Sequence, residues 1–270
     1  MRVKTVLLAV VFALCLAGVA SAQVVLKDPV GDDNGPGAYT YPTDQVYTAG
    51  SFDLVELKVT PKGKNVDFEV TVNAKLDDPW RMGVGFAVQM VFIHIDVDHK
   101  EGSGFTEGLP GTNVQFAAAD AWDYCVILSP QSSSRVKQEA STKAVAMQKG
   151  ILVPLRTKGA VRTISGSVKL EDLGGGDPAT WGYQVIMQSN EGFPDKADLL
   201  TRKVNEFEGQ HRFGGGTDFD CDPHVMDILA GKAMGEAGEA EAQHAMLAYE
   251  CDASGNSVKK ATLTMVRPGM

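Results

Sequence analysis

Two adjacent segments alternate between apolar and polar residues, and this pattern constrains the fold more than any other feature of the sequence. In residues 52–59 (FDLVELKV) and 66–72 (VDFEVTV), apolar side chains recur at every second position, with mostly charged ones between them. A period of two is typical of a β-strand with one buried face. The turn-forming residues 61–65 (PKGKN) separate the segments. The sequence therefore predicts a β-hairpin over residues 53–72.

Similar alternation recurs along the chain. It is found in VQMVFIHIDV (88–97), WDYCVIL (122–128), AVRTISGSVKL (160–170), WGYQVIMQS (181–189) and ATLTMV (261–266). Because Gly-, Pro- and Asp-rich loops separate these short segments, we expect an all-β fold, an antiparallel two-sheet β-sandwich that is jelly-roll-like. The Ala- and Glu-rich residues 236–250 predict one short helix, and we expect at most one or two short helices in all.

The first 22 residues have the pattern of a secretory signal peptide. Arg2 and Lys4 precede an apolar run, and residues 20–22 form an A-x-A cleavage signal. We expect export of residues 23–270, as a single β-sandwich binding domain, to the periplasm, the exterior or the cell surface. No later apolar run is long enough to cross a bilayer, so no transmembrane span is expected in the mature chain.

The charge of the chain narrows the class of partner. The net charge is −9 over 270 residues, and loss of the leader with its two basic residues brings it to about −11. Nucleic acids and anionic membrane surfaces attract basic patches, so neither is an expected partner. An acidic chain fits neutral ligands or cations, and the charge can also serve solubility alone.

Three cysteines follow the leader: Cys125, Cys221 and Cys251. An oxidising compartment favours a disulfide between two of them. Cys221 and Cys251 lie in polar, Asp-flanked loop sequence, whereas Cys125 lies within an apolar strand pattern. We therefore predict a Cys221–Cys251 disulfide and a buried Cys125 that acts as a small hydrophobic residue.

Residues 28–44 (DPVGDDNGPGAYTYPTD) combine carboxylates with many turn-forming residues. Asp28, Asp32 and Asp33 could bind a calcium ion together with loop carbonyl groups, because calcium prefers oxygen ligands. The alternative is a series of tight turns, since Asp and Asn side chains bond to their own backbone. Calcium is the predicted cofactor if the first interpretation holds.

A second acidic segment, residues 93–113, carries Asp96 and Asp98 at the end of a predicted strand, before a Gly-rich loop. Carboxylates two residues apart at a strand end can converge on a hard cation. The D-x-D spacing is common, and without further context we favour solvated loop acids over a cation site. The segment lacks the spacing of an EF-hand loop.

Aromatic residues are the candidates for contact with a sugar ring. Trp80 lies in a Pro- and Arg-flanked loop, Trp122 begins a predicted strand, and Tyr39 and Tyr41 lie in the opening acidic segment. Asn113 could hydrogen-bond to sugar hydroxyl groups beside them. The alternative for a tryptophan in a β-sandwich is core packing, which we favour for Trp122 and not for Trp80.

No catalytic motif is present in the sequence. It contains no GxSxG nucleophile sequence, no phosphate-binding Walker sequence, no HExxH zinc sequence and no GxGxxG at the start of a predicted helix. The histidines show no ligand spacing. The sequence therefore predicts a protein that is not an enzyme.

A series of motifs resembles one known family. The motifs are DPVGDDNGPGAYTYPTD, GSFDLVELKV, DDPWRMGVGFAVQMVFIHID, LPGTNV, WDYCVIL, WGYQVIM and RFGGGTDFDCDPHVMDIL. In this order they resemble the C-terminal binding module of glucodextranase, within a wider β-sandwich group that includes family-9 carbohydrate-binding modules and DOMON-like domains. The resemblance covers roughly residues 26–250. It implies a β-sandwich with a non-catalytic role in binding carbohydrate or the cell surface.

Three functions follow as expectations. The leading one is an exported, non-catalytic module that binds a polysaccharide or an envelope glycan. The second is a haem-b-binding electron-transfer subunit of a periplasmic redox complex, because DOMON-like sandwiches include such subunits. The third is a structural envelope protein or an accessory subunit of a secreted complex.

Overall fold

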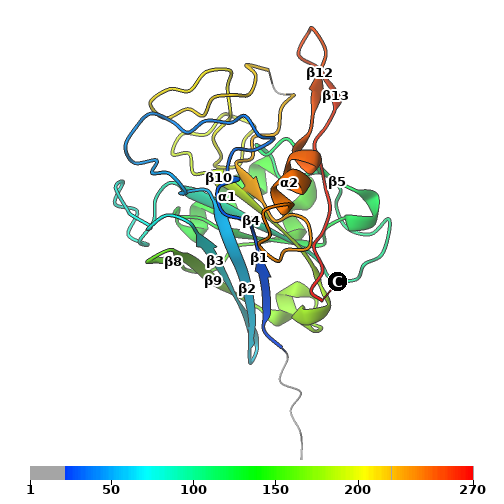
Figure 1. Ribbon diagram of the computed structural model, residues 1–270. Helices are drawn as coiled ribbons and strands as arrows, with labels where there is room; N and C mark the ends of the chain where they lie inside the picture. Colours follow the sequence, from blue (N-terminus) through cyan, green and yellow to red (C-terminus); the bar gives the residue numbers. More distant parts are fainter. Residues whose placement is uncertain (1–21, 220, 270) are drawn as a thin grey trace, which may run out of the picture.

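The computed structural model describes residues 22–219 and 221–269, and Figure 1 shows their arrangement. Two five-stranded sheets form the centre of the molecule, so the predicted all-β sandwich is confirmed. The described part of the chain also contains two α-helices, α1 Ser133–Lys143 and α2 Glu239–Leu247. Residues 1–21, which hold nearly all of the predicted leader, lie outside the described residues.

The first sheet has the strand order β1-β2-β3-β9-β8, and its pairs are antiparallel. Its strands are β1 Val24–Lys27, β2 Leu54–Lys62, β3 Asn65–Val72, β8 Thr157–Ala160 and β9 Thr163–Lys169. Strands β2 and β3 are the predicted hairpin. Their two-residue loop contains Gly63 at a φ of +64°, a left-handed conformation that glycine adopts without steric cost.

The second sheet has the strand order β11-β10-β4-β6-β7. Its strands are β4 Gln89–Asp96, β6 Tyr124–Leu128, β7 Ile151–Leu152, β10 Gly182–Ser189 and β11 Asp227–Ile228. The pairing is antiparallel except between β6 and β7, which run parallel. Every residue of β4 and of β10 is buried, so both faces of this sheet are covered.

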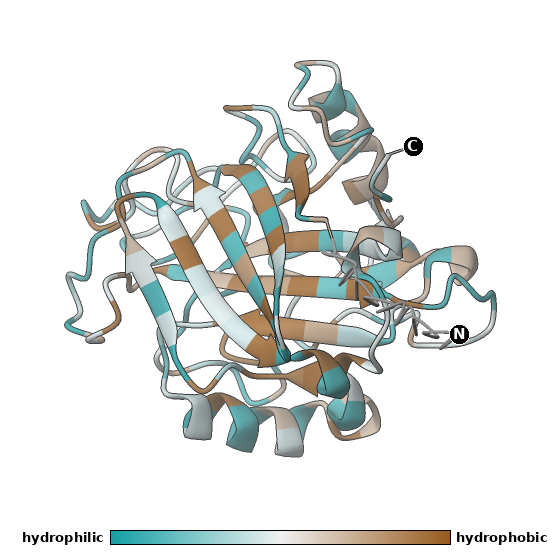
Figure 2. Ribbon diagram, turned by 90° about the horizontal axis from the view of Figure 1, so that it is seen from below, coloured by the Kyte–Doolittle hydropathy of each residue, from teal (hydrophilic) through white to brown (hydrophobic). Residues whose placement is uncertain are grey.

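One hydrophobic core fills the space between the two sheets. Leu57 of β2 and Phe68 of β3 are fully buried in it, together with Ile93 of β4 and Val185 of β10. The polar residues that alternate with these apolar ones in β2 and β3 therefore point away from this core. Figure 2 shows hydrophobic and hydrophilic residues alternating along several strands.

A second core covers the outer face of the second sheet. It joins Phe92 of β4 to Val136 of α1, Leu247 of α2, Phe116 and Leu263. The last two residues belong to β5 Gln115–Phe116 and β14 Thr262–Leu263, which pair in parallel outside the two main sheets. The predicted strand over residues 261–266 is thus shortened to two residues.

Helix α1 was not predicted. Its apolar face consists of the small set Val136 and Ala140, one turn apart, while most of its other residues are polar. Ser132 caps its first turn by accepting a hydrogen bond from the Arg135 amide. Helix α2 lies inside the predicted range 236–250, and its Gln243 and Leu247 are buried.

Short elements connect these layers. The 3₁₀-helices are η1 Ala118–Asp120, η2 Val145–Gly150, η3 Leu170–Leu173 and η4 Pro178–Thr180. Near the C-terminus, β12 Glu250–Cys251 and β13 Ser257–Lys259 form an antiparallel hairpin that projects from the molecule in Figure 1.

Candidate functional site

A polar groove lies on the outward face of the first sheet. It has a volume of about 1050 Å³, and its floor is formed by the side chains of β2, β3, β8 and β9 that alternate with core residues. Lys58, Glu69, Ser165 and Lys158 form one row across these four strands, because they are paired in register. The strand pairing therefore lines up charged and hydroxyl groups in a continuous path.

One wall of the groove is formed where the backbone of residues 83–85 lies close to that of strand β8. Gly85 has a φ of +86°, and a Cβ atom placed there would lie 2.4 Å from the Gly159 carbonyl oxygen. The Gly159 amide donates a hydrogen bond to the Val84 carbonyl at 2.7 Å. Glycine at both positions lets the loop that contains residues 83–85 lie directly against edge strand β8.

The groove has more positive than negative side chains, in contrast to the whole chain. Four cations line it (Lys58, Lys62, Arg156 and Lys158) against two acids (Asp67 and Glu69). Ion pairs join Lys58 to Glu69 at 2.6 Å and Lys62 to Asp67 at 3.5 Å. Arg156 and Lys158 are exposed and form no ion pair among the described residues. The groove can therefore offer two uncompensated cations to a ligand.

The predicted aromatic residues do not line this groove. Tyr39 is buried, and its hydroxyl group donates to the Pro223 carbonyl at 2.7 Å. Trp122 has no exposed surface, and its indole N–H donates to the Glu107 carbonyl at 2.9 Å. Burial of the rings removes both residues from the predicted ligand-binding set, and core packing is the correct interpretation for Trp122.

The other three candidates lie on the surface or just below it. Trp80 is half-buried, with its ring centre 6.2 Å from that of Tyr47 and 6.4 Å from that of His211. Tyr41 donates its hydroxyl to Asp33 and accepts a hydrogen bond from a backbone amide. Asn113 donates its side-chain amide to the Asp222 carbonyl at 2.7 Å. All three residues are partly exposed, and their contact with a sugar stays a prediction.

The opening acidic segment meets a distant carboxylate at the edge of the sandwich. Asp28 follows β1, Asp32 lies in the next loop, and Asp227 begins β11. One carboxylate oxygen from each lies within 4.8 Å of the others, and all three residues are buried. Two of the three were predicted metal ligands. Asp227 was not, because its neighbours in sequence, HVMDIL, give no sign of a ligand loop.

Burial and mutual repulsion perturb the acids of this cluster. Burial, and then the charge of Asp32, raises the pKa of Asp28 to about 9. Burial also raises the pKa of Asp32 to about 7. Burial and the charge of Asp28 raise the pKa of Asp227 well above its ordinary value. In the absence of a cation these carboxyl groups therefore tend to retain protons near neutral pH.

Asp33, the third predicted ligand in the opening segment, points elsewhere. Its carboxylate accepts a hydrogen bond from the Tyr41 hydroxyl, and it is not among the carboxylates that converge. The neighbouring Asp53 accepts hydrogen bonds from the Gly31 amide at 2.9 Å and from the Asn73 side chain at 3.0 Å. These contacts fix the loop around the cluster.

The second pair of predicted metal ligands also lies near a third carboxylate, but this cluster is more exposed and has a basic partner. Asp96 and Asp98 lie near Asp123, with one oxygen of each within 4.8 Å of the others. Arg267 forms an ion pair with Asp96 at 3.2 Å, and Asp98 is exposed and accepts hydrogen bonds from Ser103. A cation of the protein therefore already balances part of this charge. Calcium at Asp96 and Asp98 stays a prediction.

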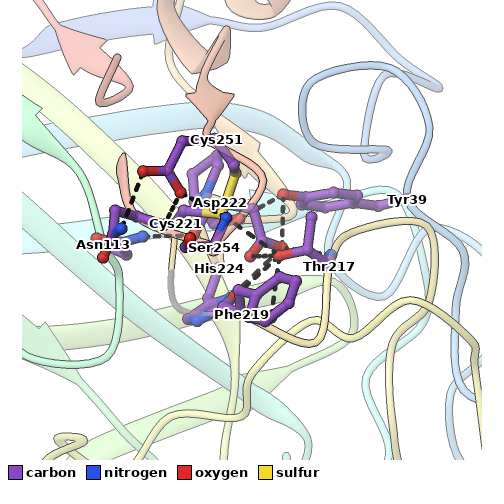
Figure 3. Close-up of a disulfide and its surroundings, with 12 residues drawn as sticks. Tyr39, Asn113, Thr217, Phe219, Cys221, Asp222, His224, Cys251 and Ser254 are labelled. Atoms are coloured by element: carbon purple, nitrogen blue, oxygen red, sulfur yellow. Dashed lines mark hydrogen bonds and ion pairs between the residues drawn. A yellow bond between two sulfur atoms is a disulfide. The ribbon is translucent and has the colours of Figure 1, made fainter. Parts of the chain in front are cut away.

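The predicted disulfide joins Cys221 to Cys251, with Cα atoms 5.8 Å apart, and Cys125 is free and buried. Figure 3 shows the bond beside Tyr39, Asp222 and Thr217. Thr217 donates its hydroxyl to Asp222 at 2.8 Å. The disulfide thus ties the loop before β11 to strand β12.

His94 is the histidine most enclosed by the fold. Its ring has no exposed surface and lies 4.8 Å from the ring of Phe116 and 5.1 Å from that of Trp122, measured between ring centres. Neither ring nitrogen has a hydrogen-bond partner among the residues that the structure describes. Aromatic rings therefore occupy the space in which this residue would have to meet a haem, and the haem alternative stays a prediction without a supporting contact.

The two packed sheets, one of which carries a long polar groove, define the fold class, a β-sandwich. The family model described as the C-terminal binding-module, SLH-like, of glucodextranase matches residues 24–265. The chain therefore belongs to this family, and the predicted resemblance to it is confirmed. No curated protein matches the chain significantly.

The family is a binding module, not a catalytic domain, and it indicates carbohydrate binding. Together with the disulfide, it fits an extracellular or cell-surface location. Among the described helices, none has the length and apolar character needed to cross a bilayer.

Proposed function

We propose that this chain is an exported, non-catalytic module that binds a glycan along the groove on the outward face of the first sheet. The row of charged and hydroxyl side chains across β2, β3, β9 and β8 carries the proposal. Sugar hydroxyl groups both donate and accept hydrogen bonds, so a ligand of this kind can pair with the ammonium, carboxylate and hydroxyl groups of the row.

The charge of the groove favours a glycan that carries acidic groups. Arg156 and Lys158 extend from the floor and wall without a carboxylate partner among the described residues, in a chain that is otherwise acidic. A uronate or a similar anionic sugar would satisfy both. A neutral glucan would use the hydroxyl and carboxylate groups and leave these two cations in water.

The test compares binding of a neutral glucan and of a polyuronate by isothermal titration calorimetry. In the Arg156→Ala, Lys158→Ala double variant we expect affinity for the polyuronate to fall roughly tenfold, because each charged contact contributes about 0.5–1 kcal/mol. Rising salt should weaken binding of the parent protein more than that of the variant.

Two matched variants locate the binding surface. Lys259→Ala removes an exposed lysine from the distant β13 hairpin and should leave affinity unchanged. Trp80→Ala removes the half-buried ring outside the groove and should also leave it unchanged. Loss of binding in Trp80→Ala, with normal binding by the groove variant, would move the ligand to the Trp80 surface and reject the groove.

A further inference from the structure

The cluster of Asp28, Asp32 and Asp227 is built from segments that are far apart in sequence. Asp28 and Asp32 lie about 200 residues before Asp227, as shown by the hydrogen bond from the Ala230 amide to Asp28, which spans 202 positions. The exposed fractions of the three residues are 3%, 4% and 0%. Three carboxylates thus meet in a place that water hardly reaches.

Several oxygen atoms of this cluster receive no hydrogen bond from the described part of the chain. They are Oδ2 of Asp28 and both carboxylate oxygens of Asp32. Oδ1 of the nearby Asp53 likewise accepts no hydrogen bond from the described residues. No lysine or arginine forms an ion pair with these residues in the part of the chain that the structure describes. Burying a carboxylate without a partner is costly, so these oxygens require either a proton or a cation.

The remaining contacts hold the carboxylates in place without occupying those oxygens. Asp227 accepts hydrogen bonds from the Leu54 amide at 2.6 Å and from its neighbouring Ile228 amide at 2.8 Å. Gln243 of α2 donates to the Asp32 carbonyl at 2.5 Å and accepts from the Ile228 amide at 2.8 Å. The backbone that carries two of the acids is therefore fixed by one buried side chain.

The donor set identifies the kind of cation. Carboxylate oxygens make up the cluster, with no histidine or cysteine among its members. Oxygen-only sets with several negative charges suit hard divalent cations, and calcium accepts irregular geometry more readily than magnesium does.

We infer that Asp28, Asp32 and Asp227 bind one calcium ion at the edge where the two sheets meet. Asp53 and Gln243 are positioning residues, since they hold the loop and the backbone around the three ligands. The ion would join the segment after β1 to strand β11. It would thereby compensate the buried negative charge, with which no lysine or arginine of the described residues forms an ion pair.

The test measures thermal unfolding of the purified protein in EDTA and again in excess CaCl₂ or MgCl₂. At a calcium concentration about one hundred times the dissociation constant, we expect the melting temperature to rise by roughly 5–10 °C. Magnesium should produce a smaller rise. Native mass spectrometry should show one added calcium ion per chain.

Two variants assign the effect to this cluster. Asp227→Asn should remove most of the calcium-dependent rise. Its amide oxygen can still accept one of the two backbone hydrogen bonds that Asp227 accepts, and loss of the charge relieves repulsion among the acids, so the variant should fold. Asp98→Asn alters the other acidic cluster and should keep the full rise. The inference is overturned if the parent protein neither gains a calcium ion nor shifts in melting temperature, or if Asp98→Asn loses the shift while Asp227→Asn retains it.

Discussion

Replacing Cys221 and Cys251 with alanine together is expected to lower the free energy of unfolding by about 3 to 4 kcal/mol. The bond closes a loop with a sequence separation of 30 residues, and the loss of chain entropy in the unfolded state gives this magnitude. The loop contains both β11 and α2, so the bond also restrains the elements around Asp227 and Gln243. Urea denaturation followed by circular dichroism measures the difference.

A reductant and a third cysteine provide the controls. Dithiothreitol should lower the stability of the parent protein toward that of the double variant and leave the double variant unchanged. Cys125→Ala keeps the disulfide, and we expect it to cost about 1 kcal/mol through lost packing alone. Equal sensitivity of the parent protein and the double variant to the reductant would contradict the assigned role of this bond.

Acid is expected to destabilise the parent protein through His94, and His94→Phe should remove this contribution. Burial lowers the pKa of His94 to about 3, below the value near 6.5 of an unfolded chain. The unfolded state therefore binds the proton more readily between these two values, and the stability that His94 provides is present above pH 6.5 and lost as the pH falls toward 3. Between pH 7.5 and 4.5 the loss is about 2–3 kcal/mol.

The measurement is the difference in unfolding free energy between pH 7.5 and 4.5, compared for the two proteins. At pH 7.5 the phenylalanine variant should be as stable as the parent or slightly more stable, because it removes a buried ring whose nitrogens have no hydrogen-bond partner within residues 22–219 and 221–269. At pH 4.5 it should be clearly more stable. Identical pH dependence in both proteins would show that His94 does not titrate as its burial requires.

Local patterns explain why much of the fold could be predicted. The hairpin of β2 and β3 follows from alternation over a few residues, and the strands near residues 89–96 and 182–189 follow in the same way. The disulfide was predictable because Cys125 differs from the other two cysteines in its apolar neighbours. Each of these inferences needed information from a short window of sequence.

The parts that could not be predicted depend on contacts between distant residues. Only Val136 and Ala140 form the apolar face of helix α1, and two residues are too few to indicate a helix in the sequence. The helix packs through them on the core of the second sheet. Asp227 joins Asp28 and Asp32 only when β11 has reached the edge of the second sheet. The groove arises from pairing of β3 with β9, strands that lie far apart in sequence.

The hydrogen bond from the Leu54 amide to Asp227 links strands of the two sheets across 173 positions of the chain. Contacts over such a separation require closure of a very long loop. We therefore expect this contact between β2 and β11 to form late, after the transition state for folding. Mutations there should accelerate unfolding while leaving the folding rate nearly unchanged. If the chain is exported as we propose, this contact between the sheets would set the lifetime of the native protein among extracellular proteases, and it would have little effect on the rate of folding.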